Sequence, residues 1–244
     1  MLHPACSSGH YKLVKLLVDA GLDMSKEDWN GDNPLEFAFR RNYGIDIIKL
    51  VPIAEYMITH GAPVTLKLQN YFKEKAEDFE FRRDNMDSEF TSEVDTAFDI
   101  LYKLFNVKKI PTRVLYDGQS TIEIQGKTWT EQYNELWNLL VPASSHANTI
   151  QGEVIRITGR ISHEILDNGA CNWDIDFKKM LKTLDEYLHI GNKLEPSEYE
   201  ELKPFFKSIK KADESLFNRQ AELAVKWVLQ NKEPITLTQV DYNR

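Results

Sequence analysis

The sequence predicts a mainly α-helical protein, with a short stack of two helical repeats followed by a helical domain that contains one small β-hairpin. Apolar residues recur at spacings of three and four over most of the chain, as they do on one face of a helix. Residues 2–24 align with residues 35–64, and Leu2 and Leu35 are 33 positions apart. We expect three parts: the repeats at 1–65, an acidic helical segment at 66–112 and a helical domain at 113–244.

The composition is that of an ordinary globular protein. The 244 residues are 42% hydrophobic and 28% charged, which allows a substantial core. The apolar runs are far shorter than the roughly 20 residues that cross a bilayer, and the N-terminus lacks the pattern of a secretory signal. Cys6 and Cys171 stand alone, as is usual in a reducing compartment. We therefore expect a cytoplasmic protein that does not bind membranes.

The opening of the chain contains signals for two helices and a tight turn. Gly9-His10 precedes an apolar helical pattern, and Gly21 can end that helix in the left-handed conformation. The residues 28–33 form a predicted turn in which Gly31 takes a positive φ. Pro34 then falls in the first turn of the next helix, where its missing N–H has no cost.

These residues resemble the ankyrin repeat. The matching pieces are Leu2-His3 with Ala5, Gly9-His10, Leu16-Leu17, Gly21 and the run from Asp28 to Leu35. The resemblance implies stacked helix pairs that bind proteins through the tips of the connecting fingers and through the concave helix face. Trp29, exposed at a finger tip, is then an anchor residue for a partner, and its packing against a neighbouring finger is the alternative. The candidate partner contacts in the finger are Lys26, Trp29, Asn30 and Asp32.

The second repeat departs from the pattern in its length. Asn42 and Gly61 are 19 positions apart, whereas Gly9 and Gly21 are 12 apart, and Pro52 lies inside the longer stretch. We expect the last helix of this repeat to be lengthened or broken there. Because no further finger and Pro-Leu start follows Gly61, the repeats are expected to stop and to pack against the residues that come next.

An acidic stretch follows the repeats. Residues 74–99 contain ten acidic and three basic residues, a net charge of −7. Such a surface repels a phosphate backbone, which argues against nucleic acid as a partner, and it attracts a basic protein. The alternative is a solvated helix face that keeps the protein soluble. The candidate contacts for a basic partner are Glu77, Asp78, Asp84 and Asp87.

The last 132 residues (113–244) predict helices and a hairpin. The hairpin is expected from Val114 to Ile124, with its turn at Asp117-Gly118. Helices are expected at about 149–167, 175–189 and 214–231 from their apolar spacing. Two pairs of residues have the spacing of a capping box: Thr128 with Glu131, and Ser197 with Glu200.

The helix at 149–167 has a polar face. It could hold a phosphate or a carboxylate of a partner. The alternatives are a surface helix with intrahelical ion pairs and a buried network that ties helices together. The spacing of His163 and Asp167 lacks the H-E-x-x-H pattern and a third ligand, and Cys171 has no histidine partner. We therefore predict no metal site, no cofactor and no catalytic residue set. The polar side chains of this face are Glu153, Arg156, Arg160 and Glu164. With His163 nearby, the candidate cluster is Glu153, Arg156, Arg160 and His163.

The stretch 140–177 resembles a segment found in uncharacterised bacterial proteins. The resemblance implies a bacterial source and no particular reaction. The function that the sequence predicts is a protein–protein interaction module, in its sharper form a bacterial immunity protein or inhibitor that binds a basic effector. The alternative is an enzyme of unknown class in the C-terminal domain, with the repeats recruiting its substrate. The matching residues of the stretch are Gln151-Gly152-Glu153, Arg156, Arg160, Asn168-Gly169 and Asn172-Trp173.

Overall fold

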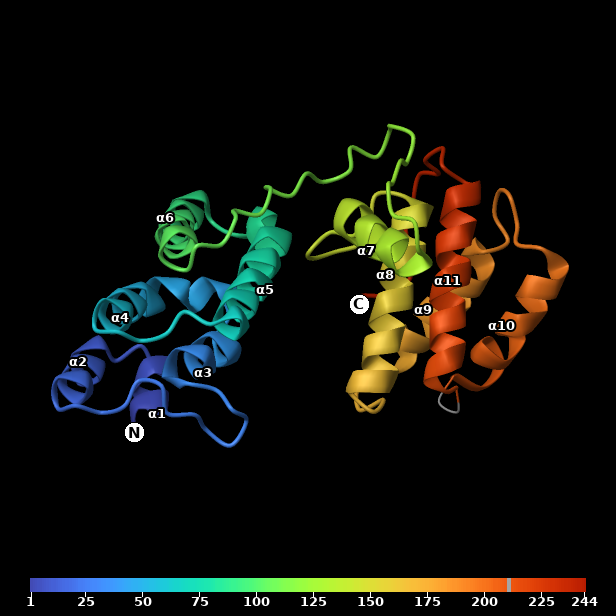
Figure 1. The fold of residues 1–244 in the computed structure, drawn as a ribbon. Coiled ribbons are helices and arrows are strands. Elements are labelled where there is room, and N and C mark those ends of the chain that lie inside the picture. Colours follow the sequence, from blue (N-terminus) through green and yellow to red (C-terminus); the bar gives the residue numbers. More distant parts are fainter. Residues whose placement is uncertain (210–211) are drawn as a thin grey trace. The chain divides into compact units, whose positions relative to one another are not determined.

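The regular structure of the chain is helical, as the spacing of its apolar residues predicts. The computed structural model describes residues 1–209 and 212–244, and in this range eleven α-helices, two 3-10 helices and one π-helix follow one another. The chain divides into two units, Met1–Thr112 and Arg113–Arg244 (Figure 1). None of the helices in the described range is long and apolar enough to span a lipid bilayer.

The first unit consists of three helix pairs that stack in two rows. Helix α3 contacts α1 and α5, and α4 contacts α2 and α6 (Figure 1). The first helices of the pairs therefore form one row and the second helices form the other. Short 3-10 helices, η1 (Gly44–Asp46) and η2 (Arg83–Asn85), precede α4 and follow α5. The pairs are α1 (Leu2–Ser7) with α2 (Tyr11–Asp19), α3 (Pro34–Arg41) with α4 (Ile47–Thr59), and α5 (Leu66–Arg82) with α6 (Ser88–Leu104).

A repeat of buried residues explains why the pairs stack. The spacing of 33 positions seen between Leu2 and Leu35 continues into α5. Because each pair buries the same positions, the third pair packs on the second as the second packs on the first. The acidic segment predicted at 66–112 is therefore part of this stack and not a separate part of the chain. Two buried positions that recur at this spacing are occupied by Leu2, Leu35 and Leu68, and by Cys6, Phe39 and Phe72.

The turns of the first unit have the predicted conformations. Gly21 and Gly31 take the left-handed conformation, with φ of 83° and 71°. Pro34 occupies the first turn of α3. Helix α4 runs unbroken through Pro52 for 13 residues, against nine in α2, so the second repeat has a lengthened helix.

The second unit is built around α8. This helix contacts α7, α9 and α11, and its side chains Val154, Ile157 and Ile161 are buried. The π-helix η3 continues α8, and α10 packs against α11. The helices predicted at 149–167, 175–189 and 214–231 are confirmed. The elements of this unit are α7 (Trp129–Leu140), α8 (Ile150–Ser162), η3 (His163–Asp167), α9 (Ile175–Tyr187), α10 (Pro196–Ser208) and α11 (Glu214–Gln230).

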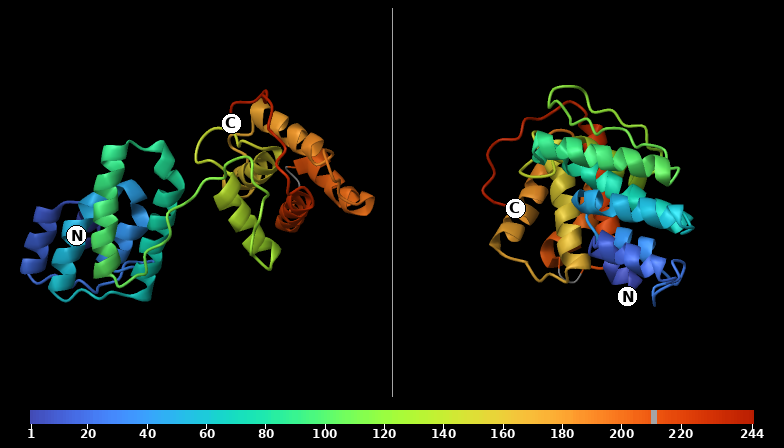
Figure 2. Two further views of the ribbon diagram at one scale, coloured as in Figure 1. Left: turned by 90° about the horizontal axis from the view of Figure 1, so that it is seen from above. Right: turned by 90° about the vertical axis from the view of Figure 1, so that its left-hand side faces the viewer.

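The β-hairpin predicted at 114–124 is not formed. Residues 113–127 run as an irregular trace without strands (Figure 2). The turn itself exists, because the Asp117 carboxylate accepts hydrogen bonds from the amides of the two residues Gln119 and Ser120, both at 2.8 Å. The two arms of the predicted hairpin pair elsewhere: Tyr116 N donates to Leu139 O at 3.1 Å, and Ile122 N donates to Lys232 O at 2.9 Å.

The helix starts of the second unit follow short-range signals. Thr128 and Glu131 form the predicted capping box of α7, and Asp174 caps α9. The capping box predicted at Ser197 is wrong by two residues, because Glu195 caps α10 together with Glu198. Pro196 then stands at the first helical position, which proline favours.

Candidate functional site

A surface loop between the first two helix pairs presents one large aromatic side chain to solvent. In this Trp29 loop (residues 26–33), Trp29 is 91% exposed. Lys26 and Asn30 beside it are also exposed. Gly31 N donates to Asp28 O at 3.0 Å, which closes a β-turn with Trp29 and Asn30 at its centre. The turn therefore holds the indole away from the body of the unit.

Hydrogen bonds of Asp28 fix the shape of this loop. Its carboxylate oxygen Oδ1 accepts from the amides of Asn30 and Asp32 at 2.8 and 2.9 Å. Its own amide donates to Asp32 O at 2.9 Å. Both sides of the turn are thus tied to one residue, and the loop has little freedom to change conformation.

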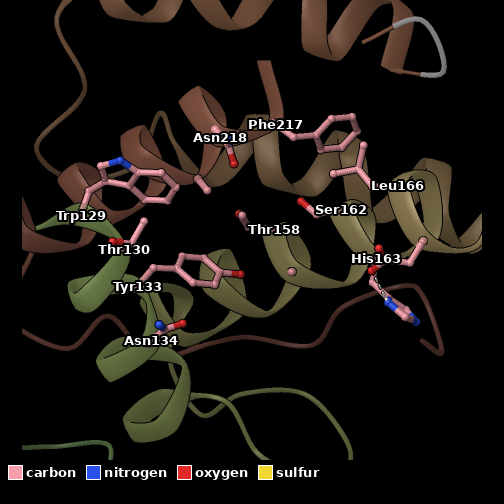
Figure 3. A pocket seen from close by; sticks show the side chains of 13 residues that line it. Trp129, Thr130, Tyr133, Asn134, Thr158, Ser162, His163, Leu166, Phe217 and Asn218 are labelled. Atoms are coloured by element: carbon pink, nitrogen blue, oxygen red, sulfur yellow. Dashed lines mark hydrogen bonds and ion pairs between the residues drawn. The ribbon is translucent and has the colours of Figure 1, made fainter. Parts of the chain in front are cut away.

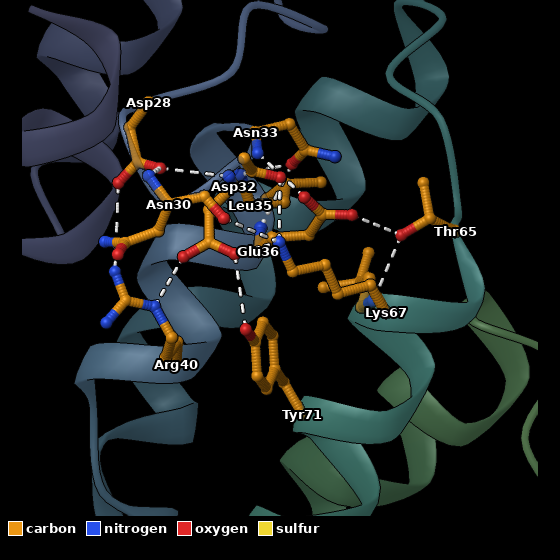
Figure 4. Close-up of polar contacts among 12 residues, drawn as sticks. Asp28, Asn30, Asp32, Asn33, Leu35, Glu36, Arg40, Thr65, Lys67 and Tyr71 are labelled. Carbon is orange, nitrogen blue, oxygen red and sulfur yellow. Dashed lines mark hydrogen bonds and ion pairs between the residues drawn. The ribbon is translucent and has the colours of Figure 1, made fainter.

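Asp32 attaches the loop to all three helix pairs, and Figure 4 shows its contacts with α3 and α5. Its carboxylate, which is 0% exposed, pairs with Arg40 of α3 and lies 2.7 Å from Lys67 Nζ of α5. Tyr71 of α5 donates to the same carboxylate at 3.3 Å. His3 of α1 has Nε2 2.9 Å from Asp32 O. The sequence predicted Asp32 as a partner contact; its burial shows instead that it positions the residues that are exposed.

The start of α3 adds a further link between the second and third helix pairs. Asn33 Oδ1 accepts from the amides of Leu35 and Glu36, both at 3.0 Å, and the Glu36 carboxylate accepts from Asn33 N at 2.7 Å. The Thr65 hydroxyl, which caps α5, also donates to Glu36. Asn33 therefore caps α3, and the Glu36 carboxylate joins α3 to the start of α5.

The charge pairs of Asp32 predict an acid-sensitive contribution to stability. Burial raises the pKa of Asp32, but hydrogen bonds and charge from Lys67 and Arg40 outweigh burial and hold that pKa below its usual value. A carboxyl group whose pKa is lowered on folding contributes stability above its unfolded pKa of about 3.9, and this contribution is lost as the pH falls through the lower folded value.

We expect Asp32→Asn to lower the free energy of unfolding by about 1–3 kcal/mol at pH 7, because Arg40 and Lys67 lose their counter-charge. The deficit relative to the unmodified chain should shrink below about pH 4. Urea denaturation followed by far-ultraviolet circular dichroism at pH 7 and pH 3 measures both values. Asp84→Asn, at an exposed position, is the control and should have little effect. A deficit that is the same at both pH values would contradict the assignment.

The acidic residues of α5 and α6 divide into two groups. Several are neutralised within the unit: Asp78 pairs with Arg82 at 2.8 Å, and Arg83 joins Glu80 of α5 to Asp95 of α6. Glu77 lies 3.6 Å from Lys73. In the described part of the chain, no basic side chain pairs with the carboxylates of the other group, most of which lie at η2 and in the first half of α6. This second group consists of Glu74, Asp84, Asp87, Glu89 and Glu93.

Two of the four polar residues predicted on α8 form a buried ion pair. Glu153 is 0% exposed and Arg156 is 2% exposed, and the Arg156 guanidinium donates to Glu153 at 2.9 and 2.6 Å. Tyr242 donates to the same carboxylate at 2.5 Å, and Ala147 N does so at 3.0 Å. His146 Nδ1 lies 3.2 Å from the carboxylate. The carboxylate therefore joins α8 to the loop before it and to the last residues of the chain.

The ion pair explains how a charge is held inside the unit. Burial raises the pKa of Glu153, but the hydrogen bonds and charge of Arg156, with bonds from Tyr242 and Ala147, keep it below its usual value. Arg156 also donates to Arg244 O at 2.7 Å. The interpretation of this face as a solvated surface is corrected for Glu153 and Arg156, because the last residues of the chain cover them.

The other two residues of the predicted cluster lie apart from the pair. Arg160 is exposed. Burial of its inner part lowers the Arg160 pKa, and so do the positive charges of Arg156 and Arg244. His163 lies on η3, where its Nδ1 is 2.8 Å from Asp167, and its side chain is 66% exposed. The four residues are thus not gathered around one opening, and we see no catalytic arrangement in them.

The residues that complete the hydrogen-bond networks of Asp32 and of Glu153 have weak signals in the sequence. Arg40 and Lys67 are ordinary basic residues of helices, and Tyr242 lies 89 positions after Glu153. Only the Asn33 capping box, with Glu36 three positions later, follows a recognisable local pattern. Among residues 1–209 and 212–244, no three His, Cys, Asp or Glu side chains are placed to hold a metal ion.

No protein-family model, no curated protein and no solved structure matches the chain.

Proposed function

We propose that this protein is a protein-binding module of the ankyrin type, and that it uses the Trp29 loop to hold its partner. In the cell it acts as a bacterial immunity protein or inhibitor that binds a basic effector. The observation that supports this proposal best is a 91% exposed tryptophan on a loop whose turn is fixed by Asp28 and Asp32. Tryptophan is among the residues that contribute most to protein interfaces.

A rigid loop favours binding because little conformational entropy is lost when the partner docks. Asp32 supplies this rigidity, since it attaches the loop to Arg40 and Lys67. Lys26 and Asn30 flank the indole and are free to make polar contacts at the edge of an interface. At 91% exposure the indole buries little surface within the unit, which leaves it available to a partner.

The unpaired acidic residues near η2 favour a basic partner. Asp84, Asp87, Glu89 and Glu93 follow one another where α5 gives way to α6. Charges of one sign raise the rate of association with an oppositely charged protein, and this effect falls as salt screens it. The neutralised residues Glu77 and Asp78 contribute less to this field than the sequence prediction assumed.

We expect Trp29→Ala to weaken binding of the protein encoded by the neighbouring gene at least about thirtyfold, because a tryptophan at the centre of an interface contributes about 2 kcal/mol or more. Binding is measured with the full chain by titration calorimetry, and the association rate is measured at low and high salt. The expected rate falls as salt rises.

Tyr43→Ala is the matched control, because Tyr43 is another exposed aromatic side chain of the first unit, at 73%. It should bind like the unmodified chain. If the neighbouring protein does not bind at all, if Trp29→Ala and Tyr43→Ala behave alike, or if the rate is indifferent to salt, the proposal fails.

A further inference from the structure

A hollow of about 390 Å³ lies on the second unit, between α7, α8 with η3, and α11 (Figure 3). Trp129 and Phe217 stand on opposite sides of it, and Tyr133 and Thr158 lie between them. Its size falls in the range of small-molecule sites, which are usually lined by aromatic and apolar side chains with a few polar groups. The π-helix η3 places Leu166 and Asp167 at its edge. Segments of π-helix are rare and are frequent at functional sites.

The lining of the hollow is nearly free of charge. Burial raises the pKa of Tyr133, so its phenol stays neutral, and its hydroxyl donates to Ile155 O at 3.2 Å. The ionisable side chains at the edge are His163 and Asp167, which pair with each other at 2.8 Å. In Figure 3 the ring of His163 points away from the middle of the hollow. A charged ligand would lose its hydration there without gaining a counter-charge, so the hollow suits a neutral molecule.

Free polar groups surround this neutral surface. Within the described residues, the side-chain amides of Asn134 and Asn218 and the hydroxyl of Ser162 make no hydrogen bond to the protein. Beneath Thr158, Gln220 Nε2 donates to the threonine hydroxyl at 3.0 Å, while Gln220 Oε1 is buried without a partner. Buried polar atoms are seldom left unpaired, so this orphan marks a place where the unit lacks a hydrogen-bond partner.

The combination indicates the class of ligand. Aromatic side chains stack on planar bases whatever the base, and an asparagine amide pairs with the amino and ring nitrogen edge of adenine. We propose that this hollow binds a neutral purine base or nucleoside, with its ring held by Trp129 and Tyr133 and its polar edge facing Asn218. The site belongs to the second unit and is independent of the partner bound by the Trp29 loop.

The test uses the full chain with adenosine as the probe and methyl glucoside as a non-planar control. The indole N–H signal of Trp129, assigned through Trp129→Phe, is followed by nuclear magnetic resonance. Adenosine should shift this signal to saturation, and the glucoside should not. Ser162→Phe, which fills the hollow from α8, should abolish the shift. Ser197→Phe, the same exchange at an exposed position of α10, should retain it.

Asn218→Ala provides a second test in case Ser162→Phe does not fold. Asn218 is exposed, so its replacement should leave the fold intact. It should weaken adenosine binding about fivefold, as expected for one lost hydrogen bond. The proposal is overturned if adenosine causes no saturable shift, if the glucoside shifts the same signal equally, or if neither Ser162→Phe nor Asn218→Ala weakens binding.

Discussion

Replacing Glu153 with alanine is expected to lower the free energy of unfolding of the second unit by about 3–5 kcal/mol. The substitution leaves the Arg156 charge buried at 2% exposure without its carboxylate. It also removes the acceptor for the Tyr242 hydroxyl and for Ala147 N. Each of these donors would then have to remain unpaired or draw water into the unit, and an unpaired buried donor costs about 1–3 kcal/mol.

Tryptophan fluorescence during urea denaturation measures this loss in the second unit. Four of the five tryptophans, among them the fully buried Trp227, lie in residues 113–244. The fifth, Trp29, is 91% exposed and changes little on unfolding. The transition seen by fluorescence therefore belongs to the second unit, even if the first unit unfolds separately.

Glu200→Ala is the control for this prediction. Glu200 lies on the surface of α10 in an exposed pair with Lys203, and such pairs contribute less than about 1 kcal/mol. We expect a change within about 0.5 kcal/mol. Equal losses for the two variants would mean that the buried pair is not what joins α8 to the residues around it.

Local signals predicted the helices well because the physics behind them acts over a few residues. The capping of α7 by Thr128 and of α9 by Asp174 depends on amides two or three positions later. The left-handed turn at Gly31 likewise depends on one residue. These features could be predicted without knowing what the helices pack against.

The prediction of a β-hairpin was wrong because alternating apolar residues indicate only that one face of a segment is buried. They do not indicate which other segment covers that face. Ile122 is 0% exposed, as the alternating pattern indicates. Its backbone bond goes to Lys232, which lies 110 positions later, and not to the other arm of the expected hairpin. Pairing between distant segments leaves no mark in a short stretch of sequence.

In the candidate sites, too, features set by neighbouring residues could be predicted and features set by distant residues could not. The exposure of Trp29 follows from the turn that contains it, and the sequence predicted that much. The burial of Asp32 and Glu153 does not follow from their neighbours, because Lys67 and Tyr242 come from far along the chain. A charged residue at helical spacing is usually on the surface, and only the fold shows the exceptions.

Close packing between α7 and α8 leads to the second large expected effect. A Cβ atom on Gly159 would lie 2.3 Å from the ring of Trp137 and 2.8 Å from the Tyr133 hydroxyl. The Tyr133 hydroxyl is held by its bond to Ile155 O at 3.2 Å, and the ring of Trp137 stacks against that of Tyr133. Glycine is the residue that allows the two helices to approach this closely.

We therefore expect Gly159→Ala to destabilise the second unit by about 1–3 kcal/mol, as overpacking of a core does. The sign of this change in the free energy of unfolding is informative, because alanine is favoured over glycine by about 1 kcal/mol in a helix interior that has room for it. Urea denaturation followed by tryptophan fluorescence, to which the buried Trp227 contributes, measures this loss of stability. A stabilised variant would show that the helices are less closely packed than these distances indicate.

A double variant separates this overpacking from any general weakness of Gly159→Ala. Trp137→Phe removes the outer ring atoms of the indole that the new methyl group would strike. The combination should be more stable than the sum of the two single losses predicts, because the smaller ring relieves the clash. Losses that simply add would place the cause of the instability elsewhere in α8, and the close contact between Gly159 and Trp137 would then not be what sets the separation of the two helices.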